Sequence, residues 1–493
     1  MMRPHRHSAR PAAKPLPITL LALLLLAALC AGPAEAAPQR MTRSGPVAGT
    51  LQDGIVIFKG IAYAAPPVGP LRWQPPRAAA RWKAPMDATR FGPTCPQAPV
   101  PWMEDLPQSE DCLTLNIWAP AHGSRLPVAV WLHGGASVNG SGAQPTFDGT
   151  RFARDGVVLV TLNYRLGQLG FFAHPELPGG GNFGFMDMIA ALHWVQDNIA
   201  AFGGDPARVT VMGESSGGMA VTALMASPQA RGLFAGAISQ SAGESSVVPL
   251  ADAVAAGSRL GTAAGAADLS ALRALPASAI IAIPREHTFA GPMLDGTTVV
   301  EQPSAAFAHG RSAPVPFLVG ANDREEAAIG ELAPAVARQR LDALFAAYPA
   351  QADAARRVYE VDRTGPVESL LRILSDAGNV EPARYYARQH HPAWLYRFSY
   401  VATKNRAEQP GARHAAELPY VFDTARWPLT AEDRQAVEAV HGTWVRFITT
   451  GDPGWPPVTA DNEDFNDFTR AGPVLGPDPL RARLDVVEAA KAR

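Results

Sequence analysis

The 493-residue sequence predicts an α/β protein, in which a mostly parallel central sheet is flanked by helices and carries helical insertions. Several short apolar runs do not alternate with polar residues, which is typical of strands buried on both faces. Stretches with helical spacing of apolar residues separate these runs. The composition, with 47% hydrophobic and 18% charged residues, is that of a globular protein.

The expected core strands are short runs rich in Val, Leu and Ile. They lie at 128–132, 157–162, 209–212 and 315–319. Between the second and third run, the segment 187–201 has apolar residues at helical spacing, so the sequence predicts a β-α-β unit here.

The remaining segments are expected to cover or border this sheet. Segment 45–60, with β-branched residues and turn signals, predicts antiparallel hairpins at the sheet's edge. Segment 250–282 is Ala-rich and predicts helices, and we expect a rim or cap built from about 250 to 387. No internal repeat or linker separates two cores, so residues 37–493 are expected to form a single domain.

The N-terminus has the pattern of an export signal. Four basic residues precede an apolar run at 18–29, and small residues around Ala34 and Ala36 offer a cleavage site. The apolar run is shorter than the roughly 18–20 residues that a membrane-spanning helix needs. We therefore predict a cleaved signal peptide at 1–36, no stable membrane anchor, and a mature protein that is secreted or periplasmic.

Cleavage would remove Cys30 and leave Cys95 and Cys112 as the cysteines of the mature chain. In an oxidising compartment, one disulfide is the simplest expectation, with two buried free thiols as the alternative.

The charge pattern and motifs exclude several function classes. The formal net charge of −2 gives no general electrostatic reason to bind nucleic acid. A G-x-G-x-x-G match at 179–184 follows a predicted loop rather than a strand, so it does not indicate dinucleotide binding. No Cys and His spacing indicates a metal site, and we expect no cofactor.

The pentapeptide 213–217, Gly-Glu-Ser-Ser-Gly, is a candidate nucleophile motif centred on Ser215. The motif alone is weak evidence, but it directly follows a predicted strand and opens an apolar helical stretch. Such a tight reversal presents the serine hydroxyl above the sheet. Because serine is a poor nucleophile at neutral pH, a histidine and an acid are required downstream.

Six further runs, together with this motif, give the chain a strong family resemblance. They lie at 58–63, 66–69, 109–118, 163–167, 194–199 and 202–206. From about 45 to 457, the chain resembles the type-B carboxylesterase family, which includes para-nitrobenzyl esterases and cholinesterases. The resemblance implies an α/β-hydrolase fold and a small-molecule carboxylic ester as substrate.

The resemblance also implies the partners of Ser215. The family's acid lies five residues after a glycine that ends a core strand, and this spacing leads from Gly320 to Glu325. Glu326 stands where the family usually has Gly, so a second carboxylate competes for the role, although the spacing favours Glu325. The family's histidine motif corresponds to 411–422 and assigns the base to His414. The order Ser, Glu, His is that of α/β hydrolases.

An oxyanion hole is implied by the run His-Gly-Gly-Ala at 133–136. Gly135 and Ala136 are the expected backbone N–H donors, together with Ser216. Ser216 replaces the family's usual Ala, and Ser137 stands where an aromatic residue is common, so we expect a wider or more polar acyl pocket.

Supporting roles follow from the same resemblance. Glu214 and Ser241 are expected to lie behind the catalytic pair. Cys95 and Cys112 correspond to the family's first disulfide, and we expect Trp102, between them, to have a packing role rather than to bind a cation.

Two other functions are compatible with this fold. A non-catalytic, neuroligin-like binding protein would keep the fold, but such relatives lose the nucleophile, whereas this chain retains Ser215 and His414. Amide or lactone hydrolysis uses the same chemistry, and the sequence does not separate it from ester hydrolysis. Nothing in the sequence indicates an oligomeric state.

Overall fold

The computed structural model describes residues 37–177, 179–244, 247–284, 291–328 and 332–491. The predicted signal peptide at 1–36 lies outside the described residues. The chain divides into two units, Met1–Pro38 and Gln39–Arg493, and all elements given below belong to the second.

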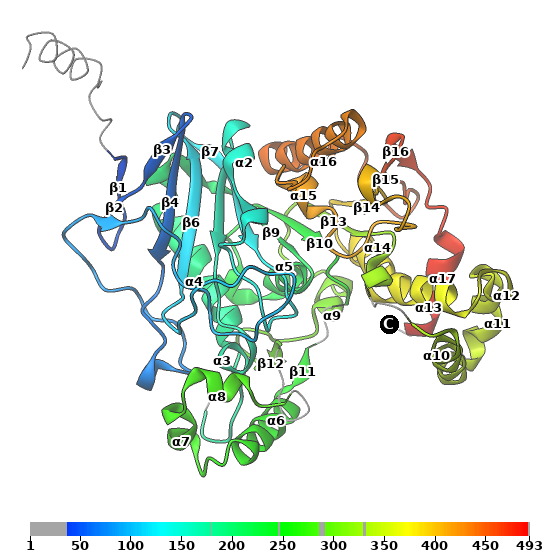
Figure 1. Ribbon diagram of the computed structural model, residues 1–493, viewed down its shortest axis with the longest axis horizontal. Coiled ribbons are helices and arrows are strands. Elements are labelled where there is room, and N and C mark those ends of the chain that lie inside the picture. Colours follow the sequence, from blue (N-terminus) through cyan, green and yellow to red (C-terminus); the bar gives the residue numbers. More distant parts are fainter. Residues whose placement is uncertain (1–36, 178, 245–246, 285–290, 329–331, 492–493) are drawn as a thin grey trace, which may run out of the picture. The chain divides into compact units, whose positions relative to one another are not determined.

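An 11-stranded sheet forms the centre of this unit, with the strand order β16-β15-β14-β13-β10-β9-β7-β8-β6-β4-β3 (Figure 1). Its parallel part consists of β8 (Val158–Leu162), β7 (Leu126–Leu132), β9 (Gly204–Glu214), β10 (Gly236–Gln240), β13 (Phe317–Asn322), β14 (Ala393–Phe398) and β15 (Phe465–Thr469). All four predicted core strands lie in this part. The α/β class with a mostly parallel sheet is therefore confirmed.

The two edges of the sheet are antiparallel. β3 (Thr50–Gln52) and β4 (Ile55–Ala62) form the predicted hairpin, which β6 (Thr114–Pro120) joins to β8. At the other edge, β16 (Gly472–Gly476) pairs with β15. Two short sheets lie apart from the main one: β1 (Gln39–Met41) with β2 (Pro46–Ala48) and β5 (Met86–Asp87), and β11 (Val248–Pro249) with β12 (Met293–Leu294).

Alternate residues of β7 point into two separate cores. Val128, Val130 and Leu132 pack in the core that contains α4 (Phe183–Asn198) and α5 (Ser216–Ala226). Ala129 and Trp131 pack in the core that contains α2 (Thr150–Arg154) and α16 (Ala431–Thr450). Because both faces are covered, each core strand lacks polar alternation. The predicted β-α-β unit is β8-α4-β9, and β7 lies between its two strands.

The predicted helices at 250–282 are α6 (Leu250–Ala263), α7 (Leu269–Ala274) and α8 (Ala277–Ile281). A second group of helices lies together in Figure 1: α10 (Pro334–Ala347), α11 (Pro349–Val358), α12 (Val361–Thr364) and α13 (Pro366–Ser375). These helices enclose an apolar cluster of their own. The range of the predicted rim, about 250 to 387, also contains β13, which corresponds to the predicted core strand at 315–319. It further includes α9 (Pro303–Ala308) and most of α14 (Glu381–Gln389), which pack against α5 and against β13 and β14 respectively.

Three short helices complete the set: α3 (Gly167–Gly170), α15 (Leu418–Val421) and α17 (Arg481–Lys491). None of the helices in the described ranges combines the length and the apolar character that crossing a membrane requires. Cys95 and Cys112 form the predicted disulfide. Trp102, in the loop that this bond closes, is 61% exposed, which does not fit the packing role predicted for it.

Candidate active site

Ser215 occupies the single residue between the end of β9 and the start of α5. Its backbone has φ 58° and ψ −126°, a left-handed conformation that non-glycine residues rarely adopt. The Ser215 N–H donates to the Gln240 carbonyl on neighbouring β10 at 2.9 Å. A side chain at Gly217 would collide with the Leu132 carbonyl oxygen, so the glycine two residues after the serine is a steric requirement of the turn.

Glu325 approaches the imidazole of His414 from the end of β13. Its Oε2 lies 2.5 Å from His414 Nδ1, and its Oε1 accepts the backbone N–H of Asn322 at 2.7 Å. The Glu325 side chain is 1% exposed, whereas that of His414 is 34% exposed. The neighbouring Glu326 has its backbone N–H bound to Ser375 Oγ. Of the two candidate acids, the structure therefore brings Glu325 to the histidine.

The other imidazole nitrogen, His414 Nε2, lies 3.1 Å from Glu214 Oε1. Burial raises the pKa of the Glu214 carboxyl to about 8. Burial by itself lowers the pKa of His414, but the carboxylates of Glu214, Glu325 and Glu417 outweigh burial and raise it to about 10. The predicted supporting residue Glu214 is thus in direct contact with the predicted base.

A further buried carboxylate, Glu417, contributes to the raised pKa of His414 and was not predicted as a site residue. Its Oε1 accepts Gln240 Nε2 at 3.0 Å, and its Oε2 accepts Asn322 Nδ2 at 2.7 Å. Gln240 Oε1 in turn accepts the Trp444 indole N–H at 2.9 Å. Burial raises the pKa of Glu417. The signal for this residue was its place in the run 411–422, three residues after His414.

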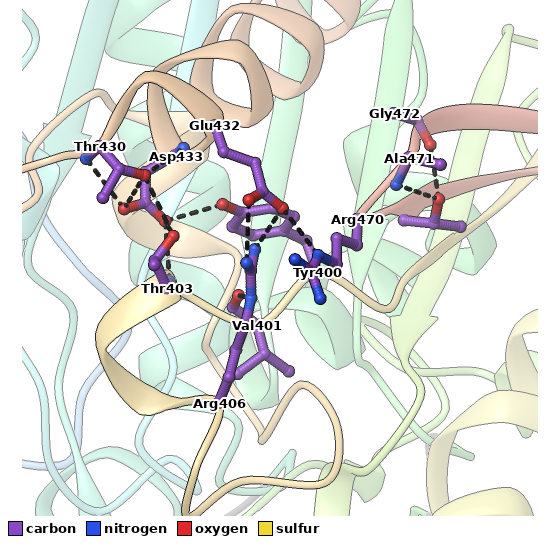
Figure 2. A network of polar contacts seen from close by, with 11 residues as sticks. Tyr400, Val401, Thr403, Arg406, Thr430, Glu432, Asp433, Arg470, Ala471 and Gly472 are labelled. Carbon is purple, nitrogen blue, oxygen red and sulfur yellow. Dashed lines mark hydrogen bonds and ion pairs between the residues drawn. The ribbon is translucent and has the colours of Figure 1, made fainter.

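Hydrogen bonds and an ion pair fix the loop that carries His414 at both of its ends. Near the histidine, Ala412 N–H donates to Asp323 Oδ1 at 2.7 Å, and Arg324 N–H donates to the Ala412 carbonyl. Further back, the polar network of Figure 2 ties the loop to the start of α16. There, Tyr400 donates its hydroxyl to Asp433 Oδ1 at 2.7 Å, and Arg406 pairs with Glu432.

The predicted oxyanion turn lies against Ser215. Gly135, Ala136 and Ser137 have φ values of 109°, 54° and 58°, so two non-glycine residues in succession are left-handed. A Cβ added at Gly134 would lie 3.0 Å from the Ser215 Cβ, which shows how closely the turn approaches the serine. The Ser137 N–H donates to Ser216 Oγ at 3.1 Å. The hydroxyl that distinguishes Ser216 from alanine therefore holds this strained turn.

Two groups behind the turn are also fixed. The Tyr164 hydroxyl donates to the His133 carbonyl at 2.8 Å, and the two rings stack with centroids 4.4 Å apart. Burial lowers the pKa of His133 to about 4, which keeps its ring neutral. Ser241 follows β10, and its N–H donates to the Gly320 carbonyl at 2.8 Å, but its buried Oγ contacts neither Glu325 nor His414 by a hydrogen bond.

The site thus holds a hydroxyl on a constrained turn, an imidazole with a carboxylate at each nitrogen, and a turn of backbone N–H groups. Within the described ranges, no group of three or more His, Cys, Asp or Glu residues could hold a metal ion. The chemistry that these groups support is nucleophilic attack assisted by a general base.

Known proteins are similar to this chain in sequence and in fold. The model of the carboxylesterase family matches residues 36–475. A para-nitrobenzyl esterase of Bacillus subtilis (strain 168) is 36% identical, over 84% of this chain and 91% of that protein. A fumonisin B1 esterase of Sphingopyxis macrogoltabida is also 36% identical, over 90% of this chain and 89% of its own. A solved PNB esterase structure has a TM-score of 0.81 at 32% identity and covers 92% of this chain and 100% of the esterase.

Proposed function

This chain belongs to the carboxylesterase family, has the α/β-hydrolase fold and is a carboxylic ester hydrolase, and from this premise we propose that it acts through an acyl-enzyme on Ser215. The observation that carries the proposal is the contact of Glu325 with His414 Nδ1. A hydrogen-bond acceptor at Nδ1 favours the neutral tautomer with the proton on Nδ1, in which Nε2 is unprotonated and can accept a proton.

In the proposed reaction, His414 Nε2 removes the Ser215 proton while Oγ attacks the ester carbonyl. The resulting oxyanion is bound by the backbone N–H groups of Gly135, Ala136 and Ser216, and each such donor is worth roughly 3 kcal/mol of barrier. His414 then returns the proton to the leaving alcohol. Water repeats the sequence on the acyl-enzyme and releases the acid.

The carboxylates have distinct proposed tasks. Glu325 orients the imidazole and stabilises its charged form during attack. Glu214 lies at the nitrogen that must receive the proton, so it tunes the charge of His414, and Ser241 supports the backbone behind Glu325 through its bond to β13.

The test is the variant Ser215→Ala, assayed with 4-nitrophenyl butanoate. We expect turnover to fall by at least about 10⁴-fold, because loss of the nucleophile leaves only binding and oxyanion stabilisation. Ser258→Ala, on an exposed part of α6, is the matched control and should keep full activity. A fluorophosphonate probe should label the unaltered protein at Ser215. Folded Ser215→Ala protein that still turns over the ester contradicts the proposal, and failure of the probe to label Ser215 favours a non-catalytic binding role.

We also propose that residues 1–36 direct export and are removed, so that the enzyme works in the periplasm or outside the cell. The bonded pair Cys95–Cys112 supports this proposal, because disulfides persist in oxidising compartments. Mass spectrometry of the exported protein should find an N-terminus after Ala36. A full-length chain retained in the cytoplasm contradicts it.

A further inference from the structure

A cavity of about 360 Å³ adjoins the oxyanion turn. Its walls come from the disulfide loop (Pro96 to Val100), the turn (Ala136, Val138 and Asn139), the start of α3 (Gly167 and Gln168) and the end of α8 (Ile281). Because Ala136 belongs both to the turn and to the cavity wall, a group bound here lies beside the oxyanion turn. A volume of this size suits part of a small-molecule substrate.

Gln97 links two segments of this wall by hydrogen bonds. Its side-chain amide donates to the carbonyls of Cys95 and Gly140, both at 2.9 Å, and accepts the Gly140 N–H at 2.7 Å. The disulfide loop is thereby fixed to the end of the oxyanion turn. The hydrogen-bonding capacity of Gln97 is used within the protein and offers little to a ligand.

Two other amides in the wall are not used in this way. Asn139 Oδ1 is buried and has no hydrogen-bond partner among the described residues, which is unfavourable unless a ligand or solvent supplies one. The Gln168 side chain, on a residue that is 9% exposed, makes no hydrogen bond to another described residue. Both line the cavity, so a ligand there meets free donors and acceptors.

The backbones that carry these amides are held firmly. Gly167 N–H donates to the Ser137 carbonyl at 2.7 Å, and the Trp73 indole donates to the Gln168 carbonyl at 2.8 Å. Asn139 N–H donates to the Gly135 carbonyl at 3.1 Å. Recognition through such groups needs little reordering on binding.

The rest of the wall is uncharged. No Asp, Glu, Lys, Arg or His is among the described residues that line the cavity, and Val138, Leu166 and Ile283 supply aliphatic surface. Among the described lining residues, a cationic or anionic group would find no partner of opposite charge to offset the loss of its hydration. A polyhydroxylated ring suits the cavity, because its edge carries hydroxyls and its faces are apolar.

We propose that this cavity binds a neutral, polyhydroxylated part of the ester substrate, such as a sugar or cyclitol ring, and that Gln168 selects it by hydrogen bonds to its hydroxyls. The inference rests on the proposed esterase function and names the substrate class of that same site.

Two matched pairs of esters test the proposal about the cavity and also show whether the acyl or the alcohol side of the ester enters the cavity. For the alcohol side, the pair is glucose 6-butanoate and cyclohexylmethyl butanoate. For the acyl side, the pair is methyl quinate and methyl cyclohexanecarboxylate. Butanoylcholine provides a cationic alcohol, and kcat/KM is measured by titration of released acid.

The variant is Gln168→Leu, which nearly preserves volume and removes the amide. In at least one pair we expect kcat/KM for the hydroxylated ester to fall by about tenfold in the variant, while its apolar partner changes less than about twofold. Unchanged rates with the apolar ester also show that the variant is folded. Gln52→Leu, on the exposed edge strand β3, is the matched control and should leave both esters unaffected.

The outcomes separate the two proposals. If neither the unaltered protein nor its Gln168→Leu and Gln52→Leu variants hydrolyse 4-nitrophenyl butanoate, the proposed function fails. If that ester is hydrolysed but Gln168→Leu lowers both members of each pair equally, or lowers neither, the inference about the cavity is overturned. Preference for butanoylcholine over glucose 6-butanoate also overturns it.

Discussion

His414 Nε2 and Glu214 Oε1 lie 3.1 Å apart, and Glu214 directly precedes Ser215 in the chain. The proposed base therefore has a buried carboxylate at the nitrogen that must accept the serine proton. Because Glu325 lies at the other nitrogen, the imidazolium form is stabilised from both sides. The protonation of His414 is consequently the property of this site that is most sensitive to substitution.

The variant Glu214→Gln tests this relationship through the pH dependence of activity. The pKa of His414 is raised to about 10, and only neutral imidazole can take the serine proton, so activity should increase as pH rises through values above the ordinary histidine pKa of about 6.5. Removing the Glu214 charge lowers the pKa of His414, so the acid limb of kcat/KM should move to lower pH by roughly one unit. The position of the acid limb is measured from kcat/KM for ethyl butanoate hydrolysis between pH 5 and 10. An unmoved acid limb would show that Glu214 does not control His414.

Glu→Gln substitutions at positions 325 and 326 test which of the two carboxylates is the catalytic acid. Glu325→Gln should lower kcat on the order of 10³–10⁴-fold, because the amide can present a donor to Nδ1 and favour the wrong imidazole tautomer. Glu326→Gln is the adjacent control and should change kcat less than about threefold, since its structural contact is made by its backbone N–H. Single-turnover kinetics with 4-nitrophenyl butanoate report both. A larger loss in Glu326→Gln would reassign the acid.

Ser216→Ala tests the hydroxyl that holds the oxyanion turn. Loss of the bond from Ser137 N–H leaves two left-handed residues less restrained, so we expect kcat to fall by about three- to tenfold with little change in KM. Affinity for a trifluoromethyl ketone, which forms an oxyanion on Ser215, should fall in parallel. Equal affinity in both proteins would mean that the hydroxyl does not position the N–H donors, and Ser216→Thr, which keeps the hydroxyl, should retain most of the activity.

Removing the Cys95–Cys112 bond should lower the free energy of unfolding. For a sequence separation of 17 residues, the chain-entropy estimate gives about 3 kcal/mol. Urea unfolding of the double variant Cys95→Ala/Cys112→Ala measures the loss. The reduced, unsubstituted protein is the control and should unfold at the same urea concentration as the double variant. Equal stability of the oxidised protein and the double variant would contradict the estimate.

Local sequence patterns predicted the core strands and the turn at Ser215 because their causes are local. Strands covered on both faces must be apolar throughout, as in β7 and β8, and a reversal as tight as that before α5 requires glycine. The hairpin of β3 and β4 was predictable because its β-branched residues and turn signals are also local in the sequence. β15 was not, because Phe465–Thr469 mixes Asn, Asp and Thr with two aromatic residues.

Contacts between segments that are distant in the sequence were harder to predict. Glu417 becomes a buried carboxylate only because Gln240 and Asn322, more than 90 residues away, supply its hydrogen bonds. The approach of Glu214 to His414 also depends on how β9 and the loop after β14 meet. Trp102 was misjudged because its size favours burial on average, whereas its position in the disulfide loop leaves it in solvent.

The disulfide loop has a practical consequence for comparing enzyme preparations. Residues 96–100 lie inside the loop and line the cavity beside the oxyanion turn, whereas Ser215, Glu325 and His414 lie outside it. Protein produced in a reducing cytoplasm would keep its nucleophile and base but lose a covalent restraint on the cavity wall. Titration of active serines would then report full occupancy while ester preference differed between batches. Substrate profiles are therefore comparable only between samples with the same number of free thiols.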